Sequence, residues 1–185
     1  METYELNVAG LTRHLPIIPI NENIKIASFV ILGDTELVTA TAPALAKKLP
    51  EADILVTAEA KGIPFVHELS KVLNMKRYVV ARKSVKSYME NPLTIEVNSI
   101  TTQTPQILCL DQLDVELIKG KRVALIDDVI STGESMKALE ELVQKADGNI
   151  VAKAAILAEG DAAEHKDIIF LEKLPIFPQD PTHKD

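Results

Sequence analysis

An unbroken apolar run that leads into two acidic residues and a loop of small residues constrains the fold of this chain most. Residues 123–126 are apolar, Asp127 and Asp128 follow, and residues 131–135 read STGES. A continuous apolar run predicts a strand covered on both faces, as in a parallel sheet. Residues 134–146 have apolar side chains at helical spacing. The small residues are therefore predicted to form the turn between a buried strand, ending before the aspartates, and a helix N-terminus.

A turn of this kind can bind an anion, because free backbone N–H groups and the positive end of the helix dipole meet there. Two carboxylates beside the turn would repel a bare phosphate. They are compatible with a ligand that also offers hydroxyl groups or a metal ion for the carboxylates to hold. A sugar phosphate fits this arrangement. The alternative interpretation is a helix-capping turn with solvated aspartates.

Composition excludes several classes of protein. The 185 residues predict one domain, and a hydrophobic content of 46% argues against disorder. The net charge of −7 argues against a nucleic-acid surface, and the lone Cys109 excludes an internal disulfide framework. No apolar run approaches the roughly 18 residues of a membrane span, and the first ten residues lack a signal-peptide pattern. We therefore expect a cytoplasmic enzyme or regulator without membrane or nucleic-acid partners.

Strand-like and helix-like segments alternate along most of the chain. Strands are predicted at 53–58, 77–81, 150–158 and 167–171, and helices at 36–48 and 63–74. This alternation predicts an α/β fold with a central, mainly parallel sheet and helices on both faces. In such sheets, ligands bind beyond the carboxyl ends of the strands. The loops after Ala58, Ala81, Ile126 and Ala158 are therefore expected to surround one site.

Two regions do not fit the alternation. Residues 84–105 are polar and lack helical periodicity, so we expect a flexible loop, with a strand pair at 93–97 and 106–110. Residues 11–35 are rich in β-branched side chains and contain two prolines. They are expected to form strands and turns over the edge of the sheet, within one domain that spans residues 1–185.

The segment VALIDDVISTGES resembles the phosphoribosyl pyrophosphate signature of the type I phosphoribosyltransferases. The resemblance implies that family's fold, with residues 11–35 as a small hood over the site. It also implies that Asp127 and Asp128 hold the ribose hydroxyls. The residues implied for the 5′-phosphate are Ser131, Thr132, Gly133, Glu134 and Ser135.

Two further segments resemble the purine members of this family. The segment EAKG resembles their pyrophosphate loop, and ARK resembles the sequence that leads into their flexible loop. The resemblance implies a pyrophosphate site of Glu59, Ala60, Lys61, Gly62, Arg82 and Lys83. Lys83 is the first candidate for a catalytic cation, beside Asp127 and Asp128. Each segment alone has an ordinary alternative interpretation: EAKG could be a common turn, and ARK could be a run of solvated charges.

The base is predicted less directly. Ser131 stands where hypoxanthine–guanine enzymes carry an aspartate, and the segment VNSITTQ resembles a loop of xanthine enzymes. Both features favour the adenine or xanthine branch. By resemblance, the base would lie between hood residues 26–34 and the loop Glu159, Gly160 and Asp161. Acidic groups there could accept hydrogen bonds from an exocyclic amine, or only from water.

The resemblance thus implies a purine phosphoribosyltransferase that converts phosphoribosyl pyrophosphate and a purine base into a nucleoside monophosphate. It also implies Mg²⁺ held through substrate and water, with no direct protein ligand, and a homodimer. The alternative is a regulator that binds phosphoribosyl pyrophosphate or a nucleotide without turnover. The acidic charge argues against the DNA contact that such repressors make.

Overall fold

A five-stranded parallel sheet forms the centre of the molecule in the computed structural model, which describes residues 2–97 and 106–179. The strand order is β10-β9-β8-β4-β5. The strands are β4 (Ile54–Ala58), β5 (Val79–Ala81), β8 (Arg122–Ile130), β9 (Asn149–Glu159) and β10 (Ile168–Leu174). The predicted α/β fold with a parallel sheet is therefore confirmed.

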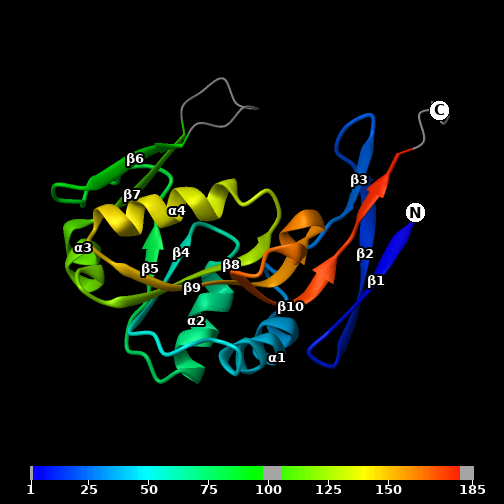
Figure 1. Ribbon diagram of the computed structural model, residues 1–185, viewed down its shortest axis with the longest axis horizontal. Helices are drawn as coiled ribbons and strands as arrows, with labels where there is room; N and C mark the ends of the chain where they lie inside the picture. Colours follow the sequence, from blue (N-terminus) through cyan, green and yellow to red (C-terminus); the bar gives the residue numbers. More distant parts are fainter. Residues whose placement is uncertain (1, 98–105, 180–185) are drawn as a thin grey trace.

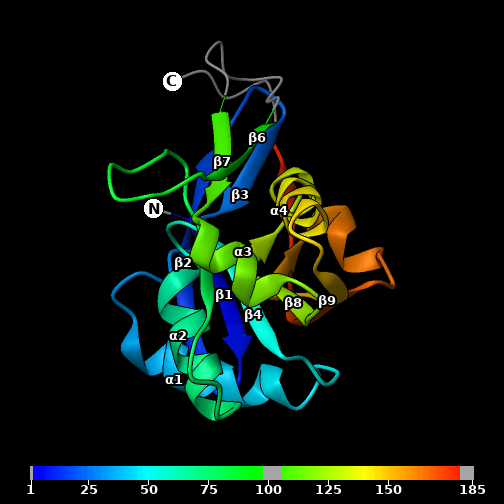
Figure 2. The same ribbon diagram turned by 90° about the vertical axis from the view of Figure 1, so that its left-hand side faces the viewer.

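Helices cover both faces of this sheet, as predicted (Figure 1). Helices α1 (Thr35–Ala46) and α2 (Ile63–Val72) lie on one face, and α3 (Gln112–Ile118) and α4 (Glu134–Lys145) on the other. The view turned by 90° shows the same separation (Figure 2). Each face has its own apolar cluster, one around Phe65 and Leu69 of α2, the other around Leu142 of α4. Burial of these helix faces holds the strand ends in fixed positions.

A second, antiparallel sheet stands beside the first (Figure 1). Its strands are β1 (Thr3–Val8), β2 (Leu11–Pro19), β3 (Ile24–Ala27) and β11 (Ile176–Pro178), in the order β1-β2-β3-β11. The sheet thus includes strands on both sides of the predicted range 11–35, and β11 was not predicted. An ion pair between Arg13 of β2 and Asp34, at 2.7 Å, ties the sheet to the start of α1.

The predicted strand pair is present as an antiparallel hairpin of β6 (Leu93–Val97) and β7 (Gln106–Leu110). The connection at 98–105 lies outside the described residues, so the flexible-loop prediction for that part stays a prediction. Helix α3 was not predicted. It has one buried residue, Ile118, while Leu113 is 63% exposed, so its apolar pattern is too short to indicate a helix.

The two central strands of the parallel sheet, β4 and β8, are paired along only part of their length. Strand β4 pairs with β8 only from Ile54 to Val56, whereas β8 stays paired with β9 as far as Ile130. Along the chain, β5 is added on the far side of β4, and β9 and β10 on the far side of β8. The carboxyl ends of β4 and β8 therefore form a switch point, where open α/β sheets bind their ligands. No helix in the described part of the chain is long and apolar enough to cross a membrane.

Candidate active site

A cavity of about 600 Å³ lies at this switch point. Its walls come from the ends of β4 and β8, from residues 26–32 beside the antiparallel sheet, and from the β6–β7 hairpin. Of the site residues predicted from sequence, those that line it are Glu59, Ala60, Lys61, Lys83, Asp127, Asp128, Ser131, Ser135 and Glu159. Segments far apart in the chain thus contribute to one pocket.

Asp127 and Asp128 lie inside β8. The prediction that the strand ends before them is wrong, because β8 continues its pairing with β9 up to Ile130. Asp128 is only 6% exposed, and its backbone N–H donates to Asp127 Oδ1 at 2.9 Å. Burial, together with the adjacent Asp128 carboxyl, raises the pKa of Asp127. Two such carboxyls need hydrogen-bond donors, and vicinal hydroxyls of a sugar would supply them.

The turn after β8 forms a smaller hollow of about 50 Å³ beside the main cavity. Ser131, Thr132, Gly133 and Ser135 line it, so four of the five predicted phosphate residues meet there. Gly133 has φ of 82° at the N-cap of α4, a conformation that glycine adopts without strain. The N-terminal N–H groups of α4 are directed at this hollow by the helix geometry, which suits a phosphate. Glu134, the remaining member, is exposed in the first turn of α4.

The turn between β4 and α2 forms the opposite wall, with Lys61 bringing a positive charge to the cavity. The peptide bond between Glu59 and Ala60 is cis. Gly62 lies behind this wall, and a Cβ at that position would collide with Thr57 Oγ1 and lie 3.6 Å from Asp127 Oδ1. A glycine is therefore required here because the turn passes too close to the Thr57 side chain for a Cβ.

Glu59 connects the two basic segments. Its Oε1 accepts from the Lys83 backbone N–H at 2.6 Å and lies 3.2 Å from Arg82 Nε. The hydrogen bond from Lys83 lowers the pKa of Glu59, so the carboxylate stays charged. Arg82 also donates to the Tyr88 hydroxyl at 2.7 Å and lies outside the cavity lining. The structure thus brings Lys83 to the cavity, while Glu59 and Tyr88 engage the Arg82 guanidinium.

The end of the cavity near the antiparallel sheet is more apolar. Phe29, Val30 and Leu32 line it, and the cavity lining also includes Ile107 of β7 and the half-buried Glu159 at the end of β9. Burial raises the pKa of Glu159. A flat heterocycle with a polar edge fits such a surface.

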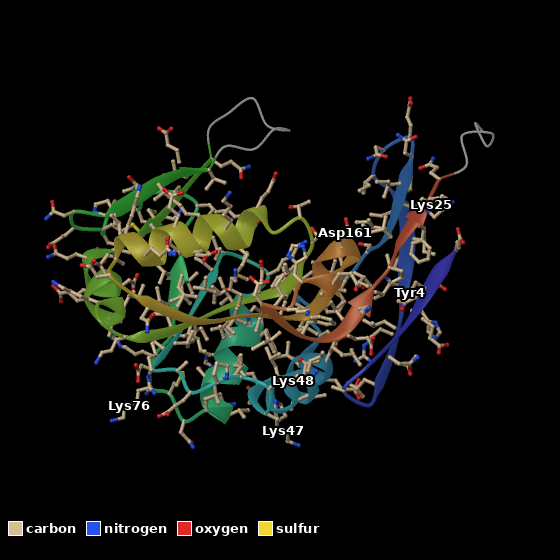
Figure 3. The ribbon with its side chains drawn as sticks, in the orientation of Figure 1. Tyr4, Lys25, Lys47, Lys48, Lys76 and Asp161 are labelled. Atoms are coloured by element: carbon tan, nitrogen blue, oxygen red, sulfur yellow. The ribbon has the colours of Figure 1, made fainter. Side chains whose placement is uncertain are left out.

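The other two residues predicted for the base lie outside the cavity lining. Gly160 packs under Ile176, whose Cδ1 would lie 2.5 Å from a Cβ at that position. Asp161 is exposed on the 3₁₀ helix η1 (Gly160–Glu164), where Figure 3 labels it. Of the three predicted residues, Glu159 alone lines the pocket.

Sequence reasoning missed the contribution of the hairpin. Val97, Gln106, Ile107 and Leu108 line the cavity, although none was among the predicted site residues and Val97 alone belongs to a segment singled out from sequence, VNSITTQ. Their sequence pattern indicates only a strand pair, and the packing of the hairpin against α4 places them at the site. Within residues 2–97 and 106–179, no group of three or more His, Cys, Asp or Glu side chains could hold a metal ion.

The fold and the site together define an α/β protein whose pocket, at the sheet's switch point, suits a phosphorylated ligand with hydroxyl groups. A family model described as phosphoribosyl transferase domain matches residues 32–185. The adenine phosphoribosyltransferase of Thermosipho africanus is 33% identical over 132 residues, which are 69% of this chain and 72% of the relative. This chain belongs to the phosphoribosyltransferase family, in its purine branch.

Relatives in this branch differ in the base that they are named for. The hypoxanthine/guanine phosphoribosyltransferase of Methanocella paludicola is 35% identical over 111 residues, 60% of this chain and 54% of the relative. The crystal structure of adenine phosphoribosyltransferase from Saccharomyces cerevisiae, complexed with an imino-altritol bisphosphate and adenine, shares the fold. It superposes with a TM-score of 0.67 at 20% identity and covers 85% of this chain and 93% of that one. The family assignment and the fold agree with the predictions from sequence.

Proposed function

We propose that this purine phosphoribosyltransferase transfers ribose 5-phosphate from phosphoribosyl pyrophosphate to adenine or xanthine, in purine salvage. One observation carries the proposal: the acidic pair, the small-residue turn and two lysines line adjoining parts of one site. Each group matches a different part of the donor. The relatives named for adenine and for hypoxanthine and guanine support a purine acceptor.

The donor would bind across both hollows. Its 5′-phosphate would enter the 131–135 turn, and its ribose hydroxyls would donate to Asp127 and Asp128. The pyrophosphate group would lie against Lys61 and Lys83. A purine nitrogen then attacks C1 as the bond from C1 to the pyrophosphate oxygen breaks, pyrophosphate leaves with that electron pair, and the imidazole-ring proton of the purine passes to water or to the leaving pyrophosphate. The protein contributes mainly position and charge.

Mg²⁺ fits this pocket as a partner of the donor. The ion prefers oxygen ligands and keeps several waters when it binds substrate phosphates. We propose that donor oxygens and water hold it, without a direct protein ligand. When bound, it supplies positive charge to the leaving pyrophosphate. The residues of this chain that act beside it are Lys61 and Lys83, which balance the same charge.

Glu159 is proposed to read the edge of the base. Its carboxyl lies in the more apolar end of the cavity, where a hydrogen bond is stronger than in water. It could accept a hydrogen bond from the exocyclic amine of adenine or from a ring N–H of xanthine. Phe29 and Ile107 are proposed to contact the faces of the ring.

Pyrophosphate release from phosphoribosyl pyrophosphate and Mg²⁺ tests this function, with adenine, xanthine, hypoxanthine, guanine and orotate added separately. We expect release with adenine or xanthine, and formation of the matching nucleoside monophosphate. Release only with hypoxanthine or guanine would support the phosphoribosyltransferase activity but contradict the proposal that the base is adenine or xanthine. Donor binding without release for any base would favour the regulator alternative.

A further inference from the structure

Thr57 in β4 is a buried polar side chain that the site described above does not use. It is 0% exposed, and its Oγ1 has no hydrogen-bond partner among the residues that the structure describes. A buried hydroxyl without a partner lowers stability, and native proteins rarely keep one. By contrast, the equally buried Thr41 in α1 donates its hydroxyl hydrogen to the carbonyl of Leu37 at 2.7 Å.

Packing alone does not require a hydroxyl at this position. The neighbouring β4 residues Leu55 and Val56 are fully buried and apolar, each in one of the two core clusters. Valine has the shape of threonine and favours strands as strongly. An apolar residue would therefore fill the same space without leaving a polar atom unpaired.

The position of the hydroxyl relates it to the acidic pair. Thr57 Oγ1 and Asp127 Oδ1 both lie close to the point that a Gly62 side chain would occupy, the aspartate oxygen at 3.6 Å from it. Gly62 has no side chain, so no Cβ occupies the point that both oxygens approach. Asp127 Oδ1 accepts from the Asp128 backbone N–H at 2.9 Å, and its second lone pair can accept another hydrogen bond.

We propose that Thr57 is a positioning residue for Asp127, and that its hydroxyl donates to the Asp127 carboxylate when phosphoribosyl pyrophosphate occupies the pocket. This inference rests on the proposed function. The hydrogen bond holds the carboxylate toward the ribose hydroxyls. Because the bond forms in the complex, the hydroxyl strengthens donor binding, whereas without a partner it does not stabilise the free protein.

Thr57→Val and Thr57→Ser test the proposal, with Thr41→Val as the matched control. We expect Thr57→Val to raise KM for phosphoribosyl pyrophosphate about tenfold, the effect of one lost hydrogen bond. KM for the base stays unchanged, and the melting temperature of the free protein stays equal or rises. Thr57→Ser restores KM for the donor, and Thr41→Val leaves it at the wild-type value.

Each other outcome overturns the inference. A wild-type donor KM in Thr57→Val would show that the hydroxyl takes no part in binding. An equal rise in donor KM for Thr57→Ser and Thr57→Val would show that the effect comes from the shape of the side chain and not from its hydroxyl. A lower melting temperature, or failure to fold, in Thr57→Val would give the hydroxyl a structural role. None of these results affects the proposed function, which fails if the wild-type protein releases no pyrophosphate from the donor with any base.

Discussion

The two adjacent aspartates of β8 lie side by side with little access to solvent, and burial raises the pKa of Asp127. Asp128 is nearly inaccessible to solvent, and Asp127 Oδ1 lies 3.6 Å from the point that a Cβ on Gly62 would occupy. Groups placed at a cost to stability often serve function, and here the compensating donors would come from the ligand. The stability of the folded protein should therefore depend on pH through Asp127 in a way that ordinary surface carboxylates do not cause.

Replacement of Asp127 by Asn should make the ligand-free protein more stable at high pH. Burial and the neighbouring Asp128 raise the pKa of Asp127 above the ordinary aspartate value of 3.8. At pH values between the pKa of Asp127 in the unfolded protein and its higher pKa in the folded protein, the folded state binds more protons. The free energy of unfolding therefore falls as pH rises. Melting temperatures from pH 4 to pH 8 check this: the advantage of Asp127→Asn should be smallest at pH 4 and grow with pH.

Asp34 provides a control for this measurement, because its effect on stability should change with pH in the opposite direction. Hydrogen bonds from Arg13 lower the pKa of Asp34, so its contribution to stability is present at neutral pH and is lost as pH falls. Asp34→Asn should therefore destabilise the protein at pH 7 and less so in acid. A pH-independent difference between Asp127→Asn and wild type would contradict the description of a strained acidic pair.

The turn between β8 and α4 is the element proposed to bind the 5′-phosphate through its backbone N–H groups. Gly133 has φ of 82°, and space around it is open, so an alanine there meets strain without a collision. We expect Gly133→Ala to cost about 1 kcal/mol of unfolding free energy, and to raise KM for phosphoribosyl pyrophosphate because the N–H groups of the turn are displaced.

Gly120, in the turn before β8, is a matched control for this element. It also has a positive φ, at 69°, and open space, but it lies outside the cavity lining. Gly120→Ala should cost a similar unfolding free energy and leave KM for the donor unchanged, as measured by chemical denaturation and initial rates. Equal donor KM values for the two variants would argue against a phosphate in this turn.

Elements with a long, regular pattern could be predicted from the sequence. The apolar runs of β4 and β9, and the helical spacing of α4, are local signals that tertiary contacts reinforce. The three-residue β11 and the seven-residue α3 have no such pattern. The length of β8 was underestimated because aspartate is a poor strand former, and pairing with β9 overrides that preference.

At the scale of the whole molecule, the antiparallel sheet must keep a fixed position over the cavity for the base to bind. Arg13 of β2 makes that connection, with ion pairs to Asp34 and to Glu36, each at 2.7 Å. We expect Arg13→Gln to raise KM for the base, because residues 26–32 lose their position, while KM for phosphoribosyl pyrophosphate stays unchanged. Initial rates with each substrate varied in turn provide the measurement.

Arg122 offers the comparison for that variant. It pairs with Asp53 at 2.8 Å and with Glu51 at 3.1 Å, at the amino end of β8 and thus away from the cavity. Arg122→Gln removes a similar network of ion pairs and should change neither KM. An equal rise in base KM for both arginine variants would assign the effect to general loosening of the fold.

The site could be predicted from the sequence only where its residues are neighbours in the chain. The acidic pair, the 131–135 turn and the EAKG turn each form one short segment, so their chemistry is visible in the order of residues. Contributions from β7 and the position of Arg82 depend on packing between distant segments and were not visible. The homodimer and the cytoplasmic location stay predictions.

In the proposed function, Asp127 and Asp128 hold the ribose of phosphoribosyl pyrophosphate during base-dependent release of pyrophosphate. The direct measurement compares that release, with Mg²⁺ and the preferred base, for wild type and the double variant Asp127→Asn, Asp128→Asn. Thermal melting of both proteins serves as the control for folding. We predict that the double variant is folded and releases pyrophosphate at least about 100-fold more slowly, as expected when two charged hydrogen bonds are weakened. Undiminished release by a folded double variant would contradict the account.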